Sequence, residues 1–295
     1  MNEFRHLFKS SHLNLYEVHC SESPSSLERR LVPTEHTIGL HRRGFCLLDD
    51  GYLKVAIDPN RACYMNPGEE YALEHPNGGG CVGTVLTISR QLLVHGYRAY
   101  GIEEVEEEVG FPLTSAPVRS QLDLLHRKLI RTLARGVPRE QAQEITYAFF
   151  SGLLEAVAHA KARRPGPRQR SRTWQAHAEL VNAVRAEMSR NLGTRPSLAA
   201  LAERFGCSPF HLSRVFHHQA GLALSTYYQK LRLRVALERI LDSGESLTTI
   251  AQDLGFTHHS HLTNSFKREY GVPPSACRTK LSASELVSLV ISEPT

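Results

Sequence analysis

The sequence predicts an α+β protein with a β-rich N-terminal half and an all-helical C-terminal domain. Three observations lead to this expectation: the chain length, a change of hydrophobic period along the chain, and a duplicated helical motif. At about 150 residues per domain, the 295 residues suggest two domains. Hydrophobic residues make up 41% of the chain and charged residues 22%, so there is enough apolar mass for a core in each part.

Residues 1–112 show the pattern of short strands separated by turns. The segment 52–57 alternates apolar with small or polar side chains, directly after an Asp-Asp-Gly turn signal. Residues 82–88 form another apolar run, which follows three consecutive glycines. Short strands at this spacing, interrupted by glycine and proline, predict a small β-sandwich or barrel.

The hydrophobic period becomes helical over residues 116–162. Leucines recur at every third or fourth position in the first part of this segment, and a second apolar stripe covers residues 145–157. A pair of amphipathic helices is therefore predicted. They are expected to pack on the strand domain, to form a dimer interface, or to do both.

Composition divides the chain into four segments. Residues 1–162 form the first domain, and 163–173 form a linker because their arginines, prolines and glycine cannot build a core. Residues 174–280 form the second domain, and 281–295 are an acidic tail. Residues 171–280 hold 14 Lys and Arg against 8 Asp and Glu. A basic module beside a nearly neutral domain favours an anionic partner for that module.

The strongest signal is an internal duplication in the basic domain. Residues 201–221 and 250–271 share one pattern: a short helix that ends at glycine, a tight turn, and a second helix that also ends at glycine. Ser208 and Thr257 are expected to cap the second helix of each copy, and the final glycine suits its C-terminal cap. This is the order of elements in a helix-turn-helix motif, present twice.

A rigid spacer helix is predicted between the two copies, over residues 225–242. Apolar residues between 233 and 241 follow the pattern of one buried face, whereas Lys230, Arg232 and Arg239 lie on the opposite side. At 1.5 Å per residue, about 17 residues span roughly 26 Å. With the flanking elements, the two second helices are expected about 34 Å apart, one turn of B-DNA, so both can enter successive major grooves.

With these motifs, residues 174–280 resemble the DNA-binding domain of the AraC/XylS family of bacterial transcription regulators. The resemblance is carried by Leu201-Ala202, Gly206, Ser208-Pro209, Leu212-Ser213-Arg214, Phe216, Gly221, Ile250-Ala251, Gly255-Phe256, Ser260-His261, Phe266-Lys267-Arg268, Gly271, Pro274 and Arg278. It implies a seven-helix domain that binds double-stranded DNA and regulates transcription, usually by activation, with RNA polymerase as a further partner.

Candidate DNA contacts lie on the second helix of each copy. They are Phe210, His211, Ser213, Arg214, His217, His259, Ser260, Thr263, Asn264, Lys267 and Arg268. Arg214 is the best candidate for a bidentate contact with guanine, and a phosphate contact or plain surface arginine is the alternative. Asn264 departs from the family pattern, which often has Arg there, but Asn can read adenine through two hydrogen bonds. Lys267 and Arg268 fit phosphate contacts or solvated charge.

The N-terminal half resembles the cupin-type sensor domain of such regulators through its strand pattern, with Asn-Pro-Gly-Glu at 66–69 and His-Pro at 75–76. This resemblance implies a cupin-like β-barrel that binds a small-molecule effector, and a homodimer formed through the helices that follow. His41 and His75 are the candidate ligand-binding residues. Together with His36 and Cys81 they do not form the dense His and Glu cluster of metal-binding cupins.

No catalytic residue, metal or cofactor is predicted. The sequence has no Walker loop, dinucleotide fingerprint or nucleophile motif. Its six cysteines include no CxxC pair, which fits the reducing cytoplasm. No apolar run reaches 18 residues, so no membrane partner is expected.

Two other interpretations remain open at this point. The first is an enzyme, a metal-dependent cupin fused to a DNA-binding module, which a stoichiometric bound metal would favour. The second is a protein-interaction adaptor built from the helix pairs. DNA affinity that falls steeply with salt would argue against the adaptor, because counterion release accompanies phosphate contacts.

Overall fold

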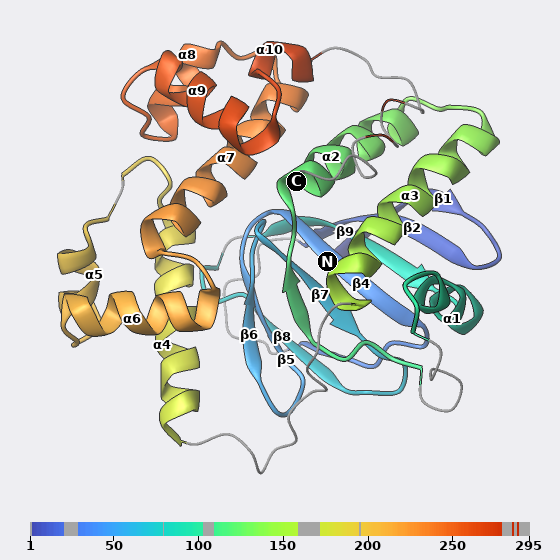
Figure 1. Ribbon diagram of the computed structural model, residues 1–295, viewed down its shortest axis with the longest axis horizontal. Coiled ribbons are helices and arrows are strands. Elements are labelled where there is room, and N and C mark those ends of the chain that lie inside the picture. The colour runs from blue at the N-terminus through green and yellow to red at the C-terminus, as the bar shows by residue number, and fades with distance from the viewer. Residues whose placement is uncertain are drawn as a thin grey trace.

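The computed structural model describes residues 2–20, 29–78, 80–102, 109–158, 172–194, 196–278, 285 and 288. Most of the linker predicted at 163–173 and of the tail at 281–295 lies outside these residues. The described part has a β-rich N-terminal region and a helical C-terminal region, which confirms the α+β fold class (Figure 1). None of its helices is long and apolar enough to cross a membrane.

Two antiparallel sheets build the N-terminal part. Their strands are β1 (Asn2–Lys9), β2 (Leu13–Cys20), β3 (Arg29–Leu31), β4 (His36–Arg43), β5 (Cys46–Asp49), β6 (Lys54–Ile57), β7 (Arg61–Met65), β8 (Tyr71–Glu74), β9 (Cys81–Ile88) and β10 (Ser115–Pro117). The larger sheet has the order β1-β2-β9-β4-β7-β10, and the smaller has the order β3-β8-β5-β6. The two sheets face each other across a cavity that both of them line.

The main core lies on the other side of the larger sheet, under three helices. These are α1 (Arg90–Ala99), α2 (Ser120–Ala134) and α3 (Arg139–Ala158). Leu15 and Leu86 of the sheet and Phe149 of α3 are fully buried in this core. Each such side chain contributes roughly 1.5–3 kcal/mol through its burial. The two helices predicted in 116–162 are thus confirmed as α2 and α3, and both pack on the strand domain.

Helix α1 contradicts the prediction of strands and turns through residue 112. The Ser89 hydroxyl caps it by accepting a hydrogen bond from the backbone N–H of Leu92, at 3.3 Å. Gly96 lies inside the helix, where a Cβ atom would come 2.3 Å from a methyl carbon of Leu154. Glycine therefore lets α1 approach α3 this closely without displacing the Leu154 side chain. Glycine also costs a helix about 1 kcal/mol relative to alanine, which weakens the helical signal of this segment.

Seven helices of the described chain form the C-terminal part, as the resemblance implied. They are α4 (Arg172–Arg190), α5 (Leu198–Arg204), α6 (Pro209–Ala220), α7 (Leu224–Asp242), α8 (Leu247–Asp253), α9 (His259–Tyr270) and α10 (Pro274–Cys277). One apolar cluster joins α4, α5, α6 and the start of α7, and another joins the rest of α7 to α8, α9 and α10. Helix α7 is therefore the spacer between two small cores, as predicted, and α6 and α9 lie at its two ends (Figure 1).

Candidate DNA-binding interface

Helix α6 begins and ends at the predicted residues. The Ser208 hydroxyl accepts a hydrogen bond from the backbone N–H of His211 at 3.2 Å, and Pro209 occupies the first helical position. Gly221 ends the helix in the left-handed conformation, with φ of 73°. Such local features make a helix begin and end at defined residues. Ser208 pairs a backbone N–H that would otherwise lack a partner, Pro209 has no N–H to pair, and Gly221 readily adopts the left-handed conformation.

Helix α9 starts one residue later than predicted. His258 is its N-cap, and its side chain makes no capping hydrogen bond. The predicted cap, Thr257, instead places its hydroxyl 3.1 Å from Nδ1 of His261. The second copy has one residue more in its turn than the first, and this residue moves the helix start past the threonine. Gly271 ends the helix with φ of 77°, as predicted.

The buried faces of the two helices fix which side chains point outward. Leu212 and Phe216 of α6 are fully buried in one cluster, and Leu262 and Phe266 of α9 in the other. Nine of the predicted contact residues are exposed: Phe210, Ser213, Arg214, His217, His259, Ser260, Asn264, Lys267 and Arg268. His211 and Thr263 are half-buried. The predicted residues thus form one outward surface on each helix, and their contact with DNA stays a prediction.

Phe210 is the most unusual residue of this surface. Its side chain is 79% exposed, so it does not serve the core. The next residue, His211, packs the edge of its ring against His177 of α4, with ring centroids 5.4 Å apart. An exposed aromatic ring of this kind can contact the methyl group of thymine, as predicted for Phe210.

The spacer helix differs from its prediction on the side opposite the apolar face. Arg232 was expected on an outward face, but it is 3% exposed. Its guanidinium lies 4.2 Å from the ring centroid of Phe256 and donates to the carbonyl oxygen of Leu254. Lys230 forms an ion pair with Glu269 of α9. The prediction was wrong for Arg232 because α7 is covered on several sides, which a single helical period does not reveal.

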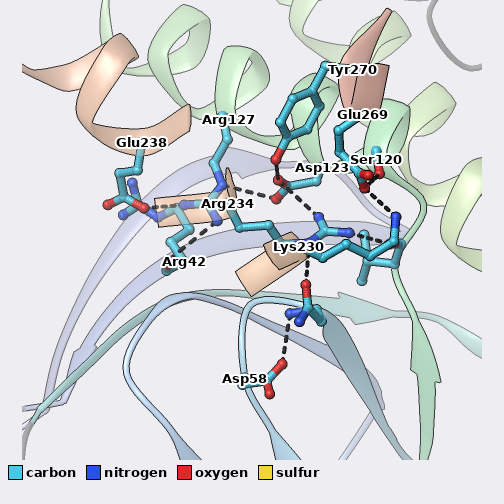
Figure 2. Close-up of polar contacts among 12 residues, drawn as sticks. Arg42, Asp58, Ser120, Asp123, Arg127, Lys230, Arg234, Glu238, Glu269 and Tyr270 are labelled. Carbon is cyan, nitrogen blue, oxygen red and sulfur yellow. Dashed lines mark hydrogen bonds and ion pairs between the residues drawn. The ribbon is translucent and has the colours of Figure 1, made fainter. Parts of the chain in front are cut away.

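A network of charged side chains joins the spacer helix to the N-terminal part. Arg127 of α2 donates to Asp123 of the same helix at 3.1 Å and forms an ion pair with Glu238 of α7. Arg234 of α7 contacts Asp123 at 2.9 Å. All four side chains are 2–3% exposed. Figure 2 shows them converging between α2 and α7. We call these four residues the buried charge network.

Further polar contacts join the buried charge network to α9, the second helix of the second copy. The phenol of Tyr270, the last residue of α9, donates to Asp123 at 3.2 Å. Glu269 accepts from Ser120 at the start of α2 as well as from Lys230 (Figure 2). Burial by itself would raise the pKa of Asp123, but the guanidiniums of Arg127 and Arg234 hold it below its usual value. The carboxylate is therefore charged in the fold, where it lies beside two guanidiniums and accepts from a phenol.

A second contact region joins α4 to the smaller sheet. Asn182 accepts a hydrogen bond from the backbone N–H of Ala56 at 3.1 Å and donates to the carbonyl oxygen of Lys54 at 2.7 Å. Its side-chain amide thus continues the hydrogen bonding of β6. The helical part thus contacts the N-terminal part at two places, through α7 and α2 in the buried charge network and through α4 and β6 here.

The cavity between the sheets has a volume of about 500 Å³. His41 and His75, the predicted ligand-binding residues, both line it. Burial lowers the pKa of His41 to about 4, and the neighbouring His75 adds to the effect. His36 does not line the cavity. Its Nε2 donates a hydrogen bond to the carbonyl oxygen of Val109 at 2.9 Å.

Cysteines are the lining residues that sequence reasoning missed. Cys20, Cys46, Cys63 and Cys81 all line the cavity, and none of the chain's cysteines, all within the described residues, forms a disulfide. Only Cys81 stood out in the sequence. The signal that could have found the others is strand alternation, since every second residue of a strand points to the same face.

Comparison with known proteins agrees with the geometry of the helical part. A family model described as a helix-turn-helix domain matches residues 201–280. The multiple antibiotic resistance protein MarA of Escherichia coli is 32% identical over 101 residues, which cover 34% of this chain and 80% of MarA.

Two further proteins match more of the chain at lower identity. The uncharacterized HTH-type transcriptional regulator YfiF of Bacillus subtilis is 27% identical over 165 residues, 52% of this chain and 51% of YfiF, so the match spans about half of that relative. The structure of ToxT from Vibrio cholerae with bound unsaturated fatty acid aligns over 92% of this chain and 96% of its own, with 13% identity and a TM-score of 0.38. From its paired helix-turn-helix motifs and its match over most of MarA, this chain belongs to the AraC/XylS family of DNA-binding transcription regulators.

Proposed function

We propose that the chain activates transcription by reading two successive major grooves with α6 and α9, under the control of a small molecule bound between its sheets. The observation that carries the proposal is the pair of outward helical faces at the two ends of one spacer. Helix α7 has 19 residues, which at 1.5 Å each span about 28 Å. With the widths of the flanking helices this length suits one turn of B-DNA.

The charges on the two faces support contact with phosphates. Helix α6 contains no acidic residue, and Glu269, the acidic residue of α9, is held by Lys230 and Ser120. Arg214, Lys267 and Arg268 are exposed beside them. Positive charge without competing carboxylates attracts the DNA backbone, and the exposure of Arg214 on α6 supports its proposed contact with a base edge.

The cavity supports the sensing part of the proposal. Its volume of about 500 Å³ falls in the range typical of small-molecule sites. His41, at the cavity, is followed in β4 by Arg42 and Arg43. The carbonyl oxygen of Arg42 accepts from Arg127 at 3.4 Å, and Nε of Arg43 lies 2.9 Å from Glu238. A ligand that shifts β4 would therefore shift two contacts of the buried charge network.

The remaining parts of the proposal concern assembly. We place the sensor in residues 1–162 and the DNA-binding domain in 174–280, and we expect the chain in the cytoplasm, contacting RNA polymerase as an activator. For a homodimer, α3 is the better of the two helices. Residues Ser120–Ile130 of α2 are almost all buried already, whereas α3 keeps an outward side that includes Glu140 and Glu144.

The test is DNA binding by the full chain, with sites selected from random duplexes and mapped by footprinting. We expect protection of two half-sites one helical turn apart and an affinity that falls steeply with salt. Arg214→Ala should weaken specific binding by about 1–3 kcal/mol, roughly 5- to 150-fold, and relax one base position. The matched control, Arg98→Ala on the exposed side of α1, outside the proposed DNA and dimer surfaces, should leave binding unchanged.

Two outcomes would contradict this proposal. An equal loss on every sequence would make Arg214 a phosphate contact and not a base-reading residue. Protection of a single half-site, unaffected by Asn264→Ala, would remove α9 from the DNA interface.

A further inference from the structure

Two thiols and one imidazole meet at one end of the cavity. Cys20 ends β2 and Cys81 begins β9, and the two are directly opposite each other in the antiparallel pair. His75 directly follows β8 of the other sheet. Its Nε2 lies 3.4 Å from Sγ of Cys81, and the ligand atoms of all three residues lie within 4.8 Å of one another. The fold thus brings together two thiols from paired strands of one sheet and an imidazole from the residue that follows a strand of the other sheet.

The backbone around Cys81 is held in a fixed position. Gly44, in the turn between β4 and β5, has φ of +90°, a conformation that other residues rarely adopt. A Cβ atom there would come 2.9 Å from Cα and Cβ of Cys81 and 2.8 Å from the carbonyl oxygen of Gly80. The turn therefore packs directly on the first residue of β9, which places this thiol before any ligand binds.

The charges around the cluster favour a divalent cation. Cys20, His75 and Cys81 all line the cavity, whose described lining contains no Lys or Arg and one acidic residue, Glu35. Two thiolates in such surroundings would be uncompensated, and an uncompensated buried charge is costly. A divalent cation bound by two thiolates and a neutral imidazole forms a site with no net charge.

We infer that Cys20, His75 and Cys81 bind one thiophilic divalent cation of the Zn²⁺ class, with a fourth ligand position open to the cavity. On binding, two thiol protons pass to solvent and two metal–sulfur bonds form, with no change of oxidation state. Bonds of about 2.3 Å to sulfur and about 2.0 Å to nitrogen separate tetrahedral ligands by roughly 3.5–3.8 Å. With the ligand atoms at most 4.8 Å apart, metal binding needs a contraction of roughly 1.0–1.3 Å at most, for the widest pair.

This inference deepens the proposed sensing function by naming a ligand class for the cavity. Metal binding is measured without DNA, so the two can fail separately. The competing chemistry is a disulfide between Cys20 and Cys81, which their positions in paired strands would also permit. The two chemistries differ at His75, which ligates a metal and has no part in a disulfide.

The experiment uses the full chain, freed of metal and kept reduced without air. Co²⁺ is added as a spectroscopic probe and then displaced by Zn²⁺ in competition with a chromophoric chelator. We expect one metal per chain, with the visible d–d and thiolate charge-transfer bands of a tetrahedral site. Cys81→Ser and His75→Ala should each weaken Zn²⁺ binding by on the order of 100-fold or more. Loss of a residue that only hydrogen-bonds to a metal ligand already lowers affinity by about 10- to 100-fold.

Matched controls separate ligation from folding. Cys46→Ser changes a buried thiol of the same cavity that lies 3.7 Å from His41 and outside the three-residue set, so it should bind Zn²⁺ like the unchanged chain. Thermal unfolding of the metal-free variants shows whether each is folded. The inference is wrong if the folded, reduced chain gives no tetrahedral Co²⁺ spectrum, or if His75→Ala binds Zn²⁺ normally. It is also wrong if Cys20 and Cys81 form a disulfide while the reduced chain takes up no metal.

Discussion

A single carboxylate holds several elements together at the residue scale. Asp123 accepts hydrogen bonds from Arg127 of its own helix and from Tyr270 of α9, and it forms an ion pair with Arg234 of α7. It is 2% exposed, so water cannot replace these partners. Moving these charges out of water costs free energy when the chain folds. Removing the Asp123 carboxylate from the folded chain would cost more, because the two buried guanidiniums would lose their counterion.

We therefore expect Asp123→Asn to lower the free energy of unfolding by about 3–5 kcal/mol, because two buried guanidiniums lose compensation. Urea denaturation of the full chain, followed by circular dichroism, measures the change. The control is Asp242→Asn, which removes the 2.8 Å ion pair with Arg131. The side chain of Asp242 is 36% exposed and that of Arg131 is 29% exposed. A partly exposed pair contributes about 1 kcal/mol or less. Similar losses for the two variants would show that Asp123 is not the centre of the network.

Helix α2 carries a pH response at the element scale. His126 is buried among α2, α3 and β9: its Nε2 lies 2.9 Å from the Thr84 hydroxyl, and its ring stacks on Phe149. Burial lowers the pKa of His126 well below its usual value, and the charge of Arg127 adds to the effect. The folded chain thus keeps this imidazole neutral over a pH range in which the unfolded chain protonates it.

The sign of the pH dependence follows from proton linkage. Below about pH 6.5 the unfolded state binds a proton that the fold excludes, so stability falls as pH falls, by about 1.4 kcal/mol per pH unit for one histidine. We expect the free energy of unfolding to decrease from pH 7 to pH 5 and His126→Gln to make the decrease shallower. Urea denaturation at each pH measures both slopes.

Two comparisons make this test specific. His217→Gln changes an exposed histidine of α6 and should leave the slope as it is. His41, whose burial also lowers its pKa, to about 4, should preserve part of the slope in the His126 variant. A His126→Gln chain with the original slope would mean that another group excludes the proton.

The strand and helical parts act as one body at the scale of the whole molecule. Leu124 of α2 belongs to the apolar cluster of the second helix-turn-helix, and the buried charge network also joins α2 to α7. Asn182 attaches α4 to β6 at the other contact region. We expect these contacts to couple the unfolding of the two parts, because unfolding of either part would expose groups of the other that are buried at the interface.

Trp174, the one tryptophan of the chain, lies in α4 and lines a cavity between α4 and the β5–β6 turn, so it reports on α4 and its contact with the strands. Its fluorescence and the far-ultraviolet circular dichroism of the whole chain should therefore give coincident unfolding transitions. Glu238→Gln removes the interdomain partner of Arg127 and Arg43 and should separate the two transitions. Asp242→Asn, at the exposed edge of the same interface, should keep them coincident. Coincident transitions in the Glu238 variant would show that the buried charge network does not couple the two parts.

The sequence alone determined the elements whose signals are local. The cap at Ser208, the left-handed glycines at 221 and 271, and the apolar period of α7 all act within a few residues, so the double helix-turn-helix and its outward residues followed from the pattern. Thr257 was wrongly predicted as the N-cap of α9. The turn of the second copy has one extra residue, which moves the start of the helix but leaves its hydrophobic period unchanged. Helix α1 was missed because Gly96 serves contact with α3 and weakens the helical pattern.

Only the tertiary structure decided what the elements do to one another. Arg127 and Glu238 are 111 residues apart, and no sequence period relates them. Cys20 and Cys81 meet because β2 and β9 pair in one particular register, and His75 joins them from the other sheet. Caps and helical faces are set by nearest neighbours along the chain, whereas burial of charge and convergence of ligands depend on packing between distant segments.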